Sequence, residues 1–337
     1  MEAYLYEQLE ENKVKCSLCN HRCVIKEDRR GICGVRENCG GVLNTQVYGK
    51  LIARHIDPIE KKPLFHLMPG SLSYSIATVG CNFKCKFCQN ADIAQMPSDR
   101  NGMIAGDHFS PDDIVDAALK GGCKTIAYTY TEPTVFFELA YDTAKLAHQK
   151  GIKNVFVTNG YMTAEALNMI NPYLDAANVD LKAYTEDFYK TYCGAKLAPV
   201  KETLKLMKSL GVFVEVTTLL IPGLNDARDE LEELAAFLAG SLGTETPWHI
   251  SRFHPTYRLT DRPSTPVKTL VMAREIGIKA GLKYVYTGNV PGENGEKTFC
   301  DQCGKLLIDR WGFYVRQNLI KNGQCSYCGA HIHGVGM

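Results

Sequence analysis

The chain has 337 residues, of which 45% are hydrophobic, so it can bury a substantial core in one large domain with appendages or in two domains. Lysines and arginines number 38 against 37 aspartates and glutamates, which leaves no overall positive charge for holding nucleic acid or an anionic membrane surface. The apolar runs fall short of the roughly 18 residues that a membrane span needs, and the acidic, polar start does not resemble a signal peptide, so we expect a cytoplasmic protein without membrane partners.

The cysteines are numerous and clustered. Of the 14 in the chain, 11 fall into three groups, which are Cys16, Cys19, Cys23 and Cys33; Cys81, Cys85 and Cys88; and Cys300, Cys303, Cys325 and Cys328. Disulfide frameworks are typical of small secreted domains, whereas this chain is large and shows no export signal. The pattern therefore favours metal ligands.

The first group lies in a cysteine-rich amino-terminal segment that we expect to span residues 1–70. Its cysteines are separated by two, three and nine residues, a spacing that fits a structural zinc or an auxiliary iron–sulfur cluster. We favour zinc here, because a small, loop-rich segment gains most from a metal that ties it together.

Residues 71–292 follow the pattern of parallel βα units, in which short apolar runs alternate with helical stretches. The expected strands are 73–79, 125–130, 154–157, 178–181, 213–219, 249–253 and 284–286. Helices are expected to begin at Ser110, Thr163 and Asp226, which are residue types that cap helix amino termini. Right-handed crossovers curve such a sheet, so we prefer a (β/α) barrel or partial barrel to a flat doubly wound sheet.

The second cysteine group directly follows the first of these strands. Barrel enzymes hold their catalytic groups at the carboxyl ends of the strands, which is where Cys81, Cys85 and Cys88 fall. A four-iron cluster usually takes four cysteine ligands, so three leave one iron with an open coordination position. The alternatives are a zinc site or three unrelated core thiols.

The segment CNFKCKFC, with Phe87 as its aromatic residue, resembles the signature of the radical S-adenosylmethionine (SAM) superfamily. The resemblance implies a partial TIM-type barrel and a [4Fe-4S] cluster whose free iron chelates SAM. It also implies an oxidoreductase that cleaves SAM with one electron, giving methionine and a 5'-deoxyadenosyl radical that abstracts hydrogen from a substrate. The resemblance is closest to enzymes similar to pyruvate formate-lyase activating enzyme.

Polar residues at later strand ends match positions that bind SAM in this family. The resemblance implies that Glu132 binds the SAM amino group and that Asn159 contacts the ribose or the amino acid part. Asp180 and Lys182, in the sequence DLK, would hold the SAM carboxylate and neighbouring groups. His254, in the sequence FHP, would lie near the adenosyl end. The alternative for each is a structural role in its loop.

Motifs along nearly the whole chain also resemble the radical SAM member of the AmmeMemoRadiSam system. This implies AMMECR1-like and Memo-like partner proteins but no particular substrate. Several activases insert a ferredoxin-like domain after the radical SAM loop, whereas residues 89–122 contain no cysteine. Electrons must then come from an external donor such as flavodoxin or ferredoxin, or through the amino-terminal cysteine group.

The third cysteine group lies in a carboxyl-terminal module, residues 293–337, which we expect to begin near the turn-forming residues 291–295. Two CxxCG knuckles, Cys300 with Cys303 and Cys325 with Cys328, are typical of a closed tetrahedral zinc ribbon. Mononuclear iron or disulfides are the alternatives.

The sequence therefore predicts a radical SAM oxidoreductase of unknown substrate. Within the enzyme class the alternative is an activase that makes a glycyl radical on a partner protein. From another class, the chain could be a zinc-ribbon module that binds nucleic acid, against which its near-neutral charge argues.

Overall fold

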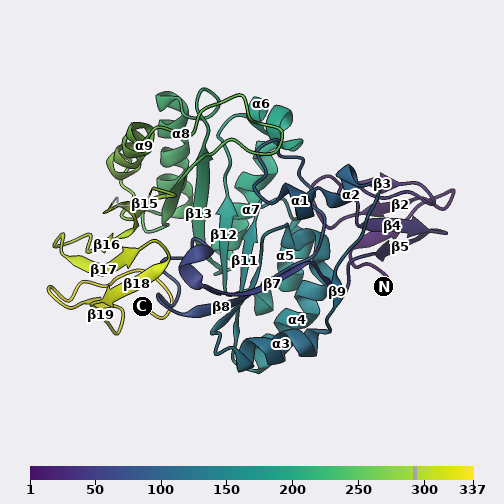
Figure 1. The fold of residues 1–337 in the computed structure, drawn as a ribbon, viewed down its shortest axis with the longest axis horizontal. Helices are drawn as coiled ribbons and strands as arrows, with labels where there is room; N and C mark the ends of the chain where they lie inside the picture. Colours follow the sequence, from purple (N-terminus) through teal and green to yellow (C-terminus); the bar gives the residue numbers. More distant parts are fainter. Residues whose placement is uncertain (291–293) are drawn as a thin grey trace.

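The computed structural model describes residues 1–290 and 294–337, and its centre is an eight-stranded sheet (Figure 1). The strand order is β15-β14-β13-β12-β11-β10-β8-β7. The parallel strands are β8 (Leu72–Ala77), β10 (Thr125–Tyr128), β11 (Lys153–Thr158), β12 (Ala176–Asp180), β13 (Phe213–Leu220), β14 (Trp248–Arg252) and β15 (Val285–Gly288). Within the described residues β15 and β7 do not pair with each other, so the sheet is open, as a partial barrel requires.

The predicted parallel βα pattern is confirmed, and each expected strand lies within about two residues of an observed one. The sequences of these strands are short runs of apolar residues, because helices cover a parallel sheet and bury both of its faces. All four residues of β10, for example, are buried. The connecting helices pack on their neighbouring strands, with α4 on β10 and β11, α7 on β13, and α9 on β14 and β15. These helices are α4 (Phe137–Gln149), α7 (Leu197–Ser209) and α9 (Val267–Lys279).

Two of the predicted helix starts are confirmed by their capping bonds. Helix α3 (Pro111–Lys120) begins after Ser110, whose hydroxyl accepts a hydrogen bond from the backbone N–H of Asp113 while the Asp113 carboxylate accepts one from the Ser110 backbone. Helix α5 (Ala164–Ile170) begins after Thr163, whose hydroxyl accepts a hydrogen bond from the backbone N–H of Ala166. These caps end the connecting loops at defined points of the chain.

The predicted helix start at Asp226 was wrong by one residue. Helix α8 (Arg228–Phe237) has Ala227 at its capping position, and the Asp226 carboxylate instead accepts a hydrogen bond from the Gly223 backbone, inside the preceding turn. The shorter helices in the described residues are α1 (Ala91–Ala94), α2 (Met96–Asp99) and α6 (Glu186–Phe188). No helix among the described residues is both long and apolar enough to cross a membrane.

The amino-terminal residues form small antiparallel sheets beside one end of the central sheet (Figure 1, purple). Their strands are β1 (Tyr6–Gln8), β2 (Val14–Cys16), β3 (Val24–Ile25), β4 (Arg36–Cys39), β5 (Val42–Thr45) and β6 (Lys50–Leu51), which pairs with β9 (Asp107–His108). Strand β7 (Ala53–Pro58) pairs along its full length with β8 in the antiparallel direction. The segment expected to end at residue 70 therefore supplies an edge strand to the central sheet.

The carboxyl-terminal module lies at the other end of the molecule (Figure 1, yellow). Its strands are β16 (Thr298–Phe299), β17 (Leu306–Trp311), β18 (Tyr314–Asn318), β19 (Ile320–Lys321) and β20 (Gln324–Cys325). Of the boundary expected near residues 291–295, residues 291–293 lie outside the described residues. Arg310 anchors the module, because its buried guanidinium donates to the Phe65 carbonyl oxygen at 2.7 Å and lies 3.5 Å from a carboxylate oxygen of Glu60.

Residues just before β8 lie at the ends of the sheet's parallel strands where those strands begin. The buried Glu215 carboxylate on β13 accepts hydrogen bonds from the backbone N–H groups of Phe65 and His66, at 3.0 and 2.7 Å, and pairs with His249 on β14 at 2.6 Å. This network holds the carboxyl-terminal module at the strand ends opposite those that carry Cys81. The carboxyl-terminal strand ends remain for a functional site.

Candidate active site

The three cysteines of the second group lie on the loop that leaves β8. Gly80, directly before Cys81, has a φ of 101°, and a Cβ atom there would lie 2.5 Å from Cγ1 of Val35. Only glycine meets both the backbone angle and the close contact. The chain therefore turns sharply out of the strand, and Cys81, Cys85 and Cys88 follow within one short loop.

A distant segment of backbone fixes the shape of this loop. The N–H of Lys84 donates to the Cys193 carbonyl oxygen at 2.8 Å, and that of Lys86 donates to the Tyr192 carbonyl oxygen at 2.9 Å. Phe83 is 1% exposed and packs between aromatic rings. Contacts with residues outside the loop therefore help to fix the positions of the three thiols.

The environment of the three thiols suits metal ligands. Burial raises the pKa of Cys81, and it raises the pKa of Cys88 to about 11. The pKa of Cys85 is raised first by a hydrogen bond with the Cys193 thiol and then by burial. A bound metal reverses this effect, since a coordinating thiol loses its proton. The N–H of Phe83 lies 3.4 Å from the Cys81 sulfur, the type of contact that supports a metal-bound thiolate.

The structure brings Asp180 and Lys182 beside this loop, at the end of β12. The Lys182 ammonium lies 2.9 Å from an Asp180 carboxylate oxygen and 5.9 Å from the centre of the Phe87 ring. Burial alone lowers the pKa of Lys182, but the neighbouring Asp180 carboxylate raises it well above its ordinary value. A stable positive charge therefore lies next to the three-cysteine loop.

Glu132 joins the loop after β10 to the loop after β11. Its buried carboxylate accepts hydrogen bonds from the Asn159 backbone at 2.8 Å, from the Thr158 hydroxyl at 2.7 Å, and from the backbone and hydroxyl of Thr134. Burial raises its pKa, although these hydrogen bonds lower it in part. Donors of its own chain thus surround the carboxylate that the resemblance assigns to the SAM amino group.

Asn159 reaches the three-cysteine loop directly. Its side-chain N–H donates to the Asn82 side-chain oxygen at 2.7 Å and lies 3.9 Å from the Cys81 sulfur. The sequence analysis did not single out Asn82 or Cys193, although both lie at the site. Asn82 stands between ligand cysteines in the sequence, which could have drawn attention to it; Cys193 had no such indication.

Among the described residues, His254 makes no hydrogen bond to another predicted site residue, so its place near the adenosyl end of SAM stays a prediction. The His254 side chain is exposed, and its Nδ1 lies 2.9 Å from the Ser264 hydroxyl. A few residues further along the same loop, the Arg258 N–H donates to the Lys86 carbonyl oxygen at 2.9 Å. This loop after β14 therefore contacts the three-cysteine loop through Arg258, which sequence reasoning missed because no motif marks it.

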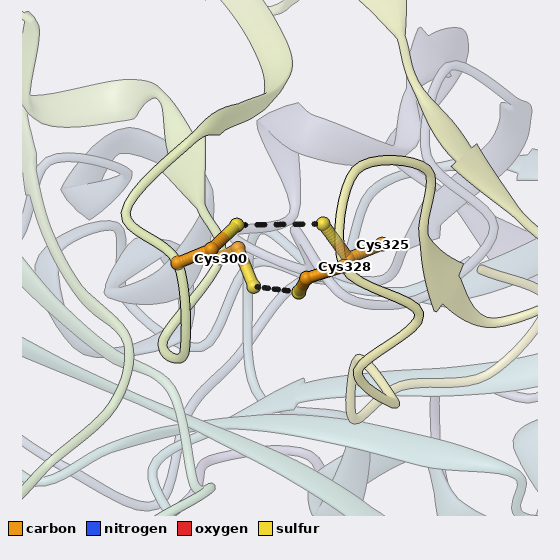
Figure 2. Close-up of side chains that lie close together, drawn as sticks. Cys300, Cys325 and Cys328 are labelled. Atoms are coloured by element: carbon orange, nitrogen blue, oxygen red, sulfur yellow. Dashed lines mark hydrogen bonds between the residues drawn. The ribbon is translucent and has the colours of Figure 1, made fainter.

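The four carboxyl-terminal cysteines form a separate metal-binding geometry (Figure 2). Their thiols point toward one another from two loops, with sulfur–sulfur distances of 3.7 Å between Cys300 and Cys328 and 3.8 Å between Cys303 and Cys325. A tetrahedral ion with bonds of about 2.3 Å to sulfur needs neighbouring sulfurs about 3.8 Å apart. The predicted four-thiolate ribbon is therefore present as a group that can hold one metal ion.

The amino-terminal cysteines also come together. Cys16, Cys19, Cys23 and Cys33 all line one cavity, which His21 and Asn82 border as well. This cavity therefore adjoins the three-cysteine loop through Asn82.

Known proteins share the sequence around the three-cysteine loop. A protein-family model for the radical SAM superfamily matches residues 75–238. An uncharacterized protein of Methanocaldococcus jannaschii is 50% identical over 333 residues, which cover 98% of each chain. The pyruvate formate-lyase-activating enzyme of Clostridium pasteurianum is 23% identical over 182 residues, which cover 50% of this chain and 72% of that enzyme.

The fold has a counterpart among solved structures. A radical SAM methyltransferase from Sphaerobacter thermophilus matches with a TM-score of 0.52 at 17% identity, over 71% of each chain. At this identity the likeness concerns the fold alone. The family match covers the three-cysteine loop and the strand ends around it, so the chain belongs to the radical SAM superfamily and is an enzyme of the radical SAM oxidoreductase type.

Proposed function

We propose that Cys81, Cys85 and Cys88 hold the [4Fe-4S] cluster at which this enzyme cleaves SAM to a 5'-deoxyadenosyl radical, which then abstracts hydrogen from a substrate. When bound, the cluster supplies one electron and an open iron site for the amino acid part of SAM. The observation that supports the proposal is the convergence of one buried and two half-buried thiols with Lys182 at the carboxyl ends of the parallel strands.

The chain's own residues divide the work of binding SAM. Lys182 binds the SAM carboxylate, and Asp180 orients Lys182 while its partly exposed oxygens accept from the SAM amino group. Glu132 acts as a positioning residue, because its carboxylate fixes the backbone of Asn159. Asn159 in turn holds the loop at Cys81 and faces the ribose or amino acid part of SAM.

Replacing Asp180 by alanine is expected to weaken SAM binding about tenfold and to leave the cluster in place. A hydrogen bond to a charged group contributes about 1.5–3 kcal/mol, and about 1.4 kcal/mol corresponds to a factor of ten. Equilibrium binding of SAM to the reconstituted protein, with iron analysis of the same sample, measures both quantities. Asp116→Ala, at an exposed position of α3, is the matched control. Loss of iron together with unchanged SAM affinity would contradict the assignment.

The function itself is tested by the products. Protein reconstituted anaerobically with iron and sulfide should convert SAM to 5'-deoxyadenosine and methionine when dithionite is added. AMMECR1-like and Memo-like proteins are the proposed partners, and adding them to the reaction should change the yield or the product. Failure of the reconstituted enzyme to form 5'-deoxyadenosine under all of these conditions would refute the proposal.

A second candidate is activation of a glycyl-radical enzyme. It is supported by the match to a protein named pyruvate formate-lyase-activating enzyme, over half of this chain. Mixing the reduced enzyme and SAM with a glycyl-radical partner should then produce an organic radical signal in electron paramagnetic resonance spectra. Isotopic labelling of glycine in the partner should change the hyperfine splitting of this signal. A signal whose splitting stays the same would exclude this candidate.

For the carboxyl-terminal cysteines we propose zinc with a structural role. The sulfur–sulfur distances of 3.7 and 3.8 Å fit a single tetrahedral ion, and four thiolates leave it no open position. The module packs on Phe65 and Tyr284, near the beginnings of the parallel strands. The three-cysteine loop lies at the opposite ends of the strands. A metal there stabilises the module and takes no part in SAM cleavage.

A further inference from the structure

The amino-terminal cysteines lie around one cavity. Cys16 ends β2, Cys19 lies in the following turn, Cys23 directly precedes β3, and Cys33 lies in the turn before β4. All four border one small, partly open cavity. Cys16 and Cys33 are buried and the other two are half-buried. Four thiols around one space form a ligand set, because unrelated core cysteines would pack against apolar side chains instead.

The spacing of these thiols does not suit a single metal ion. Across residues 1–290 and 294–337, only the carboxyl-terminal group has three or more candidate ligand atoms that all lie within 4.8 Å of one another. One zinc ion needs neighbouring sulfurs about 3.8 Å apart. The amino-terminal sulfurs are therefore more widely spread than those of the carboxyl-terminal group, and this favours the iron–sulfur alternative over the zinc.

The three-cysteine loop provides an internal reference. Cys81, Cys85 and Cys88 also fall outside the 4.8 Å limit among the described residues, although the radical SAM signature that they form binds a [4Fe-4S] cluster. In such a cluster each cysteine binds a separate iron, so the sulfurs stand further apart than around one ion. The amino-terminal group shares this wide spacing, and the ribbon does not.

Two buried donors of the cavity wall lack a partner. Arg36 and Asn82 both line the cavity and are 2% and 1% exposed. The Nε of Arg36 and the Nδ2 of Asn82 make no hydrogen bond to any residue that the structure describes. A buried N–H without an acceptor is costly, and the sulfurs of an iron–sulfur cluster are acceptors for such groups. The Arg36 guanidinium, held by Glu138 at 2.9 Å, also brings positive charge to the thiolates.

The cavity lies directly against the three-cysteine loop, on both sides of Cys81. On one side, Asn82 lines the cavity and its carbonyl oxygen lies 2.8 Å from His21 Nε2. On the other side, a Cβ atom at Gly80 would lie 3.1 Å from the Cys33 carbonyl oxygen. A group bound in the cavity would therefore be a close neighbour of a group bound at Cys81.

We propose that Cys16, Cys19, Cys23 and Cys33 bind a second [4Fe-4S] cluster, which relays electrons to the cluster of the three-cysteine loop. A one-electron donor of the flavodoxin or ferredoxin type reduces the second cluster from the 2+ to the 1+ state. That electron then reduces the cluster at Cys81, and the second cluster returns to the 2+ state, with no bond formed or broken in the relay. Cys19 and Cys23 are the half-buried ligands, so the donor approaches the second cluster from their side. The relay rests on the proposed function; the presence of the second cluster does not.

Metal analysis tests the cluster without any activity. The triple variant Cys81→Ala, Cys85→Ala, Cys88→Ala, reconstituted anaerobically with iron and sulfide, should retain about four irons per chain and, once reduced, a cluster signal in electron paramagnetic resonance spectra. The wild-type chain should bind about twice as much iron. Two zinc ions and no iron in the triple variant would overturn the second cluster.

Comparison of two reductants tests the relay. Cys23→Ala should lose most of its 5'-deoxyadenosine formation with reduced flavodoxin but keep it with dithionite, a small reductant that reaches the remaining cluster directly. Cys39→Ala is the matched control, because Cys39 is exposed and does not line the cavity. Equal activity of Cys23→Ala and the control with flavodoxin would overturn the relay. A wild-type enzyme inactive with both reductants would refute the proposed function, while the iron content of the triple variant would still decide the second cluster.

Discussion

The variant Cys85→Ala is expected to form no 5'-deoxyadenosine above background. Cys85 is one of only three cysteines in the loop, and its side chain is 7% exposed. Two thiolates do not hold four irons in place. The measurement is 5'-deoxyadenosine released by anaerobically reconstituted protein with dithionite and SAM, beside the iron content of the same preparation.

The control for this variant is Cys123→Ala, which removes a buried cysteine that lies just before β10 and outside the three-cysteine loop. It should keep wild-type turnover. The neighbouring thiol of Cys193 could take the place of the missing ligand, so the double variant Cys85→Ala, Cys193→Ala removes that route. Wild-type turnover in the double variant would show that the cluster lies elsewhere.

The central sheet could be predicted from the sequence because its strands are buried on both faces. Such strands read as short apolar runs, and the capping residues Ser110 and Thr163 mark where helices begin. Strand β7 escaped prediction because it is an edge strand with one buried residue among six and a proline at its end. Only its pairing with β8 reveals it.

The candidate site could be predicted in part. The cysteines of the loop and the Asp180–Lys182 pair follow strand ends, so their convergence is a consequence of the parallel sheet. Cys193 belongs to a helical segment more than a hundred residues away, and only the folded chain brings its carbonyl oxygen to Lys84. The sequence also does not reveal the direction in which a side chain points. The buried hydrogen bonds of Glu132 could therefore be identified only in the structure.

The two outer cysteine groups differ in how much their spacing reveals. Each ribbon knuckle is local, since the glycine after its second cysteine allows a tight turn with a positive φ, as at Gly304 and Gly329. The sequence spacing alone therefore predicts the four-thiolate geometry. The amino-terminal ligands come from separate turns, so the distances among Cys16, Cys23 and Cys33 depend on how those turns pack. The sequence left zinc and iron–sulfur open for that reason.

The variant Cys325→Ser is expected to lose the carboxyl-terminal metal and to unfold residues 298–337 locally, while SAM cleavage by dithionite-reduced enzyme continues. Binding of zinc to small structural sites is worth about 10–16 kcal/mol, enough to decide whether a small module folds. Cys325 is also buried with Ile308 and Ile332 in the module's apolar cluster, so its replacement removes packing as well. Zinc analysis, amide hydrogen exchange and the 5'-deoxyadenosine assay on one preparation measure the three effects.

The matched control is Ser326→Ala, an exposed position within the same knuckle that supplies no ligand, and it should keep both metal and protection. Continued SAM cleavage in Cys325→Ser follows from the position of the module at the amino-terminal strand edge, where Arg310 and Phe65 hold it away from Cys81. Full zinc occupancy in Cys325→Ser, or iron at these four sulfurs in the wild type, would contradict the zinc ribbon. Parallel loss of SAM cleavage would instead mean that the module supports the active site through the residues before β8.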